Sequence, residues 1–182
     1  MATLIIRPDA VASSTGFDQS GATLISRISD NDTGTRVIQN SVTSNITGIG
    51  FANDSNYSGA TINSIQLSVT GASGGKSAGP SIVCLIKNGS TTLQSSELQF
   101  EEAGTLSGNV YSTSLTPTIV DNVTVTITPD NTGVAIFEVF ITVDFTAGAS
   151  GYGKPIMGVA AANIVSVSGV ATANIANVIG VS

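Results

Sequence analysis

Residues able to perform acid–base or nucleophilic chemistry are scarce in this chain. Its 182 residues include no histidine and one cysteine. The lack of histidine excludes the usual general base, the Ser-His-Asp triad and most zinc sites. Cys84 lies inside the apolar run Ile82–Ile86 with no basic neighbour in sequence. This position indicates a small buried hydrophobe rather than a thiolate nucleophile.

Three other patterns suggest ligand sites, and each has a simpler interpretation. Glu101 and Glu102 are adjacent, so on a strand their side chains face opposite ways and cannot flank one substrate. Residues 29–34 (Ser-Asp-Asn-Asp-Thr-Gly) resemble half of a calcium loop, but the distal glutamate is missing, which favours an Asx-rich turn. Residues 74–77 (Gly-Gly-Lys-Ser) lack the spacing of a phosphate loop. We therefore expect no catalytic residue, no metal ligand and no cofactor.

Tyr57 is the candidate ligand contact. Sugar-binding β-sandwiches usually stack their ligand on exposed aromatic rings. This chain has no tryptophan and three tyrosines, and Tyr57 lies in the polar segment Asn53–Ser58. A surface tyrosine without a ligand is the simpler interpretation. A carbohydrate-binding receptor module that uses this loop remains an alternative.

The charge content restricts the kinds of partner. Charged residues make up 10% of the chain, and the net charge is −6 with six Lys and Arg. So few cations form no basic patch for phosphates or anionic lipids, and no run approaches the ~18 apolar residues of a membrane span. We expect no nucleic-acid and no membrane partner. A surface rich in Ser, Thr, Asn and Gly loses little hydration when it packs against another chain, although any β-rich soluble domain favours these residues.

Alternating hydrophobicity predicts an all-β fold. Ala135 to Phe145 places Ala135, Phe137, Val139, Ile141, Val143 and Phe145 on one face, which is typical of a long strand against a core. Residues 123–127 alternate in the same way, and the turn residues 129–133 between the two segments predict an antiparallel hairpin. About eight short antiparallel strands with turn signals between them favour a jelly-roll β-sandwich. The near alternative, an immunoglobulin-like sandwich, lacks its cysteine pair and tryptophan here.

The last 35 residues differ in character from the rest. A Gly-rich linker is followed by an 11-residue repeat over 158–168 and 169–179, and the segment has no charge after Lys154. We expect two parts, a sandwich over 1–147 and an arm over 148–182. Glycine in every unit favours extended pieces over a helix. Two units cannot close a core, so the arm should lie against its own domain or a neighbouring subunit. The residues expected to make these contacts are the branched aliphatics Val159, Ile164, Val167, Val170, Ile175 and Val178.

Parts of the chain resemble a known class of protein. Gly153–Val159 (Gly-Lys-Pro-Ile-Met-Gly-Val), leading into Ala-Asn-Ile-x-x-Val-x-Gly-Val, resembles short C-terminal repeats of structural proteins from tailed bacteriophages. The opening Thr3–Asp9 and the closing Phe137–Phe145 resemble jelly-roll domains of phage decoration, neck and tail-fibre proteins. The middle of the chain matches only in its general β character. The resemblance implies a structural role and no catalytic residues.

These observations together predict a non-enzymatic virion protein assembled in the cytoplasm of a bacterial host. The first expectation is a capsid decoration (cement) protein that stabilises the phage head by binding the major capsid protein and other copies of itself. A neck, tail-fibre or adaptor protein of the virion is the first alternative. The carbohydrate-binding receptor module is the second.

Deleting residues 151–182 should leave the domain folded and abolish its normal association, because the arm is the expected contact. Circular dichroism tests whether the shortened chain stays folded, and the measured mass of its assemblies tests whether it still associates. Unchanged assembly of the shortened chain would contradict it.

Overall fold

The computed structural model describes residues 1–18, 23–29, 35–39, 44–51, 57, 59–73, 79–130 and 133–148, and the backbone alone of 166–167 and 170–171. The chain divides into two compact units, Met1–Thr146 and Ala147–Ser182. In the second unit, the described backbone consists of β12 (Ser166–Val167) and β13 (Val170–Ala171), which pair antiparallel. Of the expected arm contacts, Val159, Ile164, Ile175 and Val178 lie outside the described residues, as do the side chains of Val167 and Val170.

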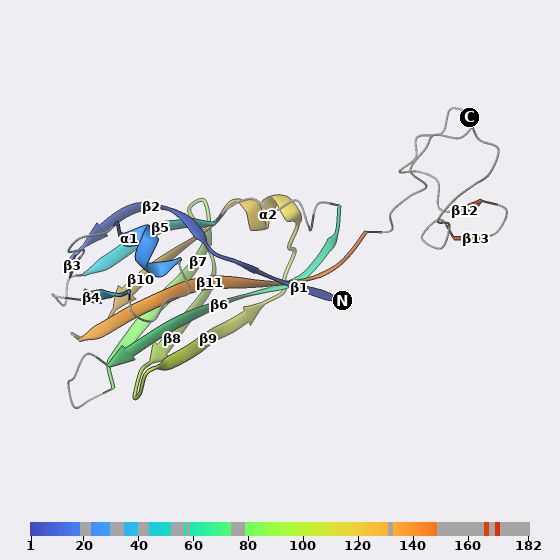
Figure 1. Ribbon diagram of the computed structural model, residues 1–182. Coiled ribbons are helices and arrows are strands. Elements are labelled where there is room, and N and C mark those ends of the chain that lie inside the picture. Colours follow the sequence, from blue (N-terminus) through green and yellow to red (C-terminus); the bar gives the residue numbers. More distant parts are fainter. Residues whose placement is uncertain are drawn as a thin grey trace. The chain divides into compact units, whose positions relative to one another are not determined.

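The first unit consists of two antiparallel sheets (Figure 1). In sheet one, β3 (Phe17–Asp18), β4 (Val37–Gln39), β11 (Val134–Thr146), β6 (Thr61–Ser73) and β9 (Gly104–Tyr111) lie in that order, and β1 (Ala2–Ile6) also pairs with β11. In sheet two the order is β2 (Pro8–Thr15), β5 (Asn45–Phe51), β10 (Val123–Pro129), β7 (Ser81–Asn88) and β8 (Thr91–Gln99). The helices α1 (Leu24–Ile28) and α2 (Pro117–Asp121) are each five residues long.

The eight strands β4 to β11 have the connectivity of a jelly roll. Sheet one contains β4-β11-β6-β9 and sheet two contains β5-β10-β7-β8, so the chain changes sheet at every connection except the one from β7 to β8. The predicted all-β jelly-roll fold of about eight antiparallel strands is therefore confirmed. β1 and β2 extend one sheet each, and the chain passes from the first sheet to the second at Arg7.

The predicted hairpin between residues 123–127 and 135–145 is wrong. β10 pairs with β5 and β7 in sheet two, whereas β11 pairs with β6, β4 and β1 in sheet one. The backbone N–H of Asp130 donates to the Ser81 carbonyl, and Gly133 has a φ of 104°. Asp130 and Gly133 fit the predicted change of direction, but the strands that precede and follow residues 130–133 lie in different sheets. A turn signal alone does not distinguish these two outcomes.

The long strand predicted at 135–145 exists as β11, with one difference in its faces. Val139, Ile141, Val143 and Phe145 lie in the core as expected. A shift in the register with β6 between Ile136 and Glu138 breaks the alternation there. Towards the N-terminal end of β11 the core residues are consequently Val134 and Ile136, in place of the expected Ala135 and Phe137. Such a bulge places two residues opposite one and reverses which of them face inward.

The core lies between the two sheets and is aliphatic. It contains Ile65, Leu67 and Val69 of β6 opposite Val125 and Ile127 of β10, each at most 1% exposed. α1 adds Leu24 and Ile28, which are also buried in this cluster, so the helix packs on the sandwich through its apolar side. Among the described residues, no helix has the length and apolar character needed to cross a membrane.

Gly71 of β6 and its partner Gly104 of β9 offer a matched test of this packing. A Cβ on Gly71 would lie 2.8 Å from the Phe100 ring and 2.9 Å from the Ala135 carbonyl, whereas one on Gly104 meets nothing within 4 Å. Gly71→Ala should therefore lower the free energy of unfolding by about 1–3 kcal/mol. Gly104→Ala should leave it unchanged or raise it by up to about 1 kcal/mol. Urea denaturation measures both, and equal effects would contradict the packing described.

Candidate functional site

The outer face of sheet one is the candidate site. We use "outer face" for the side chains of β1, β11, β6 and β9 that point away from the core, because they alternate with core residues such as Leu67 and Ile141. These side chains form three cross-strand rows: Ile5, Thr142, Gln66 and Val110; Phe140, Ser68 and Ser107; and Glu138, Thr70 and Thr105. The rows lie next to one another because their members are spaced two residues apart on β11 and β6.

The first row exposes the apolar groups. Ile5 pairs with Thr142, Thr142 with Gln66, and Gln66 with Val110. Ile5 is 49% exposed and Val110 is 55% exposed, and Met1 is the only other large hydrophobic residue this exposed among the described residues. With about 4.8 Å between strands, the row is about 14 Å long. Phe140, partly buried in the neighbouring row, adds an aromatic ring that is not part of the core cluster.

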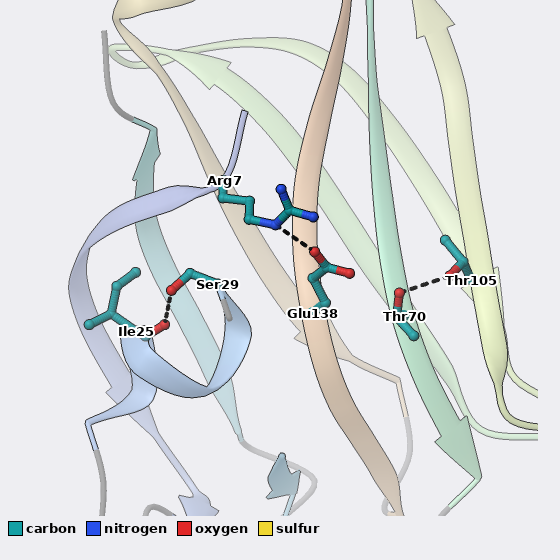
Figure 2. Close-up of polar contacts among 6 residues, drawn as sticks. All are labelled: Arg7, Ile25, Ser29, Thr70, Thr105 and Glu138. Atoms are coloured by element: carbon teal, nitrogen blue, oxygen red, sulfur yellow. Dashed lines mark hydrogen bonds and ion pairs between the residues drawn. The ribbon is translucent and has the colours of Figure 1, made fainter. Parts of the chain in front are cut away.

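Hydrogen bonds between β6 and β9 fix the polar groups of all three rows. Ser68 Oγ and Ser107 Oγ are 2.8 Å apart, as are Thr70 Oγ1 and Thr105 Oγ1, the latter pair drawn in Figure 2. Gln66 Nε2 donates to the Gly108 carbonyl at 2.9 Å. The exposed hydroxyls of Ser107 and Thr105 keep lone pairs for a further partner, because a hydroxyl oxygen accepts two hydrogen bonds and donates one, whereas Ser68 is buried. The outer face thus presents ordered hydroxyl and amide groups beside apolar ones.

The charges on the outer face largely cancel. Arg7 Nε donates to Glu138 Oε1 at 2.8 Å (Figure 2), and Glu138 is buried while the Arg7 side chain is 39% exposed. The pair joins the link between β1 and β2 to the centre of β11, 131 residues away in sequence. Asp144 follows Thr142 on the same side of β11. An almost neutral face of this kind suits a neutral partner.

α1 lies close to this ion pair in Figure 2. Thr23 caps its first turn, since the Ser26 N–H donates to Thr23 Oγ1, and Ser29 Oγ donates to the Ile25 carbonyl at 2.7 Å. Both bonds satisfy backbone groups that a short helix leaves unpaired at its ends. α1 therefore has a structural role at the edge of the sandwich.

Tyr57 does not have the exposed position that a stacking platform requires. Its side chain is 1% exposed, and its hydroxyl donates to Asp121 Oδ1 of α2 at 2.5 Å. The edge of the ring packs against Phe145, with ring centroids 6.3 Å apart. The expected ligand contact is thus a core residue in this structure. The polar sequence around Tyr57 misled the prediction, because the hydrogen-bond partner lies 64 residues away. Tyr111 is partly buried, and Tyr152 lies outside the described residues.

The groups considered for catalysis or metal binding do not come together in the described part of the chain. Glu101 and Glu102 are exposed in the bend between β8 and β9. Within the described residues, no group of three or more His, Cys, Asp or Glu side chains could hold a metal ion. Apart from Ser29, the calcium-like segment lies outside them, as does the Gly-Gly-Lys-Ser segment. Cys84 is buried as expected, and burial raises the pKa of its thiol to about 12.

Sequence reasoning missed the outer face. The polar positions of β6 and β11 were visible as the partners of the alternating core residues. The positions of Ile5 and Val110 were not, because they depend on β1 pairing with one side of β11 and on β9 pairing with β6. Short segments at opposite ends of the domain carry no local signal for these pairings.

Comparison with known proteins gives limited information. No protein-family model matches the chain, and no curated protein matches it. One similar solved structure is the C-terminal CBM6 of LamC, a marine laminarinase from Zobellia galactanivorans, with 16% identity, a TM-score of 0.47, and coverage of 78% of this chain and 98% of that one. Another is the carbohydrate-binding module CBM6cm-2 from Cellvibrio mixtus lichenase 5A in complex with cellotriose, with 12% identity, a TM-score of 0.46, and coverage of 79% and 97%. The ligand of the present chain has to be inferred from its own residues.

Cys84 should resist alkylation in the folded protein even at pH 9, because burial favours the neutral thiol and raises its pKa to about 12. An exposed thiol would be extensively ionised and reactive at that pH. Mass spectrometry after iodoacetamide treatment measures the modified fraction, with urea-unfolded protein as the positive control. Rapid modification of the folded chain would show that β7 opens readily.

Proposed function

We propose that this protein is a non-catalytic recognition module that binds a neutral polysaccharide along its outer face. The observation that carries the proposal is the row from Ile5 to Val110, in which exposed aliphatic groups flank the polar side chains of Thr142 and Gln66. A sugar ring has an apolar face edged by hydroxyl groups, and this row offers both kinds of contact. Phe140 supplies the aromatic contact that Tyr57 does not.

The charge distribution supports a neutral ligand. On the outer face the Arg7 cation is paired with Glu138, so it is not available as a free anion-binding group. Asp144 would repel an acidic polymer. The exposed hydroxyls of Ser107 and Thr105 lose little conformational freedom on binding, because their partners Ser68 and Thr70 already hold them.

The shape of the site favours weak binding that is strengthened by repetition. The outer face is the surface of a sheet, and a ligand lying on it keeps one side in water. Contacts of this kind give low affinity per site, and several linked sites increase the overall affinity without new contacts. A module carried in many copies on a larger particle would gain this advantage.

The second candidate function is that of a virion structural protein. Such a protein would decorate the capsid or, as the alternative, belong to the neck or a tail fibre. It is favoured by the uncharged 11-residue repeat, the low charge content and the resemblance to phage proteins. The two candidates are compatible, since a protein on a virion surface can also recognise a glycan. Copy number on purified particles separates a shell position from a neck or tail position.

Val110→Asp should abolish retention on neutral polysaccharides in affinity electrophoresis, with a loss of at least about tenfold in affinity, because a hydrated carboxylate replaces an apolar contact. Thr128→Asp is the matched control, since Thr128 is an exposed strand residue on the outer side of sheet two. Circular dichroism confirms that both variants fold. The proposal fails if the unaltered protein is retained by no neutral polysaccharide, or if the Thr128 variant loses as much affinity as the Val110 variant.

A further inference from the structure

β2 is an open edge of sheet two. It pairs with β5 in a regular antiparallel register from Ala10 opposite Gly50 to Thr15 opposite Asn45. Among the described residues, no strand pairs with its other side. An edge of this length presents a row of backbone N–H and C=O groups on which another extended segment can pair.

Beyond Pro8 and Asp9, β2 lacks the charges and prolines that usually protect an edge, and α1 packs beside it. From Ala10 to Thr15 it has no charged residue and no proline, and its side chains are small. The edge strands β8 and β9 differ in this respect, and β1, which is uncharged and in the described part of the chain also pairs on one side only, is five residues long. β8 carries the exposed Glu97, and β9 is tied to β8, because Ser96 Oγ accepts from the Asn109 N–H at 2.8 Å. Charged residues and covered edges prevent strand addition, so β2 is more open to it than β8 or β9.

A groove runs beside this edge. It has a volume of about 280 Å³ and lies between β2 and α1, with Val11, Leu24 and Ile25 among its lining residues. An added strand sends every second side chain to one face of the sheet. The groove would receive those side chains and offers them Val11 and Ile25 beside the polar groups of Ser13, Ser14 and Thr23.

The chain itself contains a segment of matching chemistry. Residues 155–182 have no charged side chain, and their repeat contains Val and Ile among Gly, Ala, Ser and Asn. The described backbone within it, β12 and β13, is extended. Residues 147–157 form a linker that spans up to about 36 Å when extended, which is enough to reach a neighbouring molecule.

Electrostatic repulsion favours contact between copies through the uncharged repeat segment over direct contact between two negatively charged domains. All twelve carboxylates and five of the six Lys and Arg lie before residue 147, and Lys154 is the one charged residue after it. Packing two domains against each other brings like net charges together. An uncharged segment on an uncharged edge avoids this repulsion.

We propose that the repeat segment of one copy adds as a strand to the free edge of β2 in a second copy. Each copy is then both donor and acceptor, so the contact is head-to-tail and generates a ring or a chain of subunits. Main-chain hydrogen bonds supply the affinity, and the groove beside α1 selects the aliphatic side chains. The inference deepens the virion-assembly candidate and does not depend on what the outer face binds.

Thiol cross-linking between separately labelled full-length chains tests the pairing, since the native Cys84 is buried and does not interfere. One chain carries Ala12→Cys on the β2 edge, and the other carries Asn163→Cys or Asn174→Cys, at equivalent positions of the two repeats. After mild oxidation, a non-reducing gel should show the mixed dimer. Thr118→Cys in α2, also exposed, is the matched acceptor control and should give at least about tenfold less mixed dimer.

Other outcomes would overturn the proposal. A dominant Ala12–Ala12 cross-link would show edge-to-edge pairing of two β2 strands, and a dominant repeat–repeat cross-link would show pairing of the arms alone. If a chain carrying both thiols cross-links only within itself, the segment covers its own edge. The absence of any cross-link above the Thr118 control would show that β2 accepts no arm.

A charge on the acceptor edge provides a second readout. Ser13→Lys should shift the protein to monomer in light scattering, because an exposed cation at the centre of the edge must lose its hydration when a strand adds. Thr128→Lys adds the same charge elsewhere and should leave the oligomer intact. If the unaltered protein is monomeric at every concentration, the proposal fails, whereas polysaccharide binding by the outer face is measured separately and can persist.

Discussion

The pairing of β11 with β6 is the contact on which the rest of this structure depends. Twelve residue pairs join the two strands, from Val134 with Ser73 to Thr146 with Thr61. One side of this ribbon supplies Ile65, Leu67, Val139 and Ile141 to the core, and the other side supplies the centre of the outer face. Because side chains alternate along a strand, one register determines both surfaces, and a shift by one residue would exchange them.

The chain ends of the domain are joined to this ribbon. β1 pairs with the second half of β11, so that Ala2 lies opposite Phe145, and the Arg7–Glu138 ion pair adds a contact at the point where the chain passes to sheet two. Glu138 is buried and depends on Arg7 to compensate its charge, since an unpaired buried carboxylate is costly. The first and last strands therefore hold each other in place, and the exposed Ile5 reaches the row that ends at Val110 only through this pairing.

The sparsely charged surface of the protein has a consistent physical role. Cross-strand hydroxyl pairs such as Ser68–Ser107 satisfy one another within the sheet and leave acceptor capacity outward, without the strong hydration of a charge. Similar reasoning applies to the β2 edge, where uncharged small residues permit a close approach of another backbone. Low charge content gives both surfaces a modest cost of desolvation, which suits a protein that binds through extended neutral contacts.

Features that depend on residues close in sequence could be predicted, and features that depend on contacts between distant segments could not. The alternation at residues 139–145 was predicted correctly, and the buried Cys84 followed from its apolar neighbours. The bulge near Ile136 was missed, because the register of β11 depends on its partner strand β6 and cannot be read from the residues of β11 alone. Tyr57 was misplaced for the same reason, since Asp121 and Phe145 bury it from distant parts of the chain.

The sequence by itself determined the class of the fold, the absence of histidine chemistry, the low charge content and the uncharged repeat, because composition and period-two alternation act within a few residues. Only the tertiary structure decided that the strands 123–129 and 134–146 lie in different sheets and that Ile5, Gln66 and Val110 share one row. It also decided which edge strand stays open. Each of these features depends on hydrogen-bonded pairing between strands far apart in sequence, and the choice of partner is made by the whole sandwich as it encloses its core.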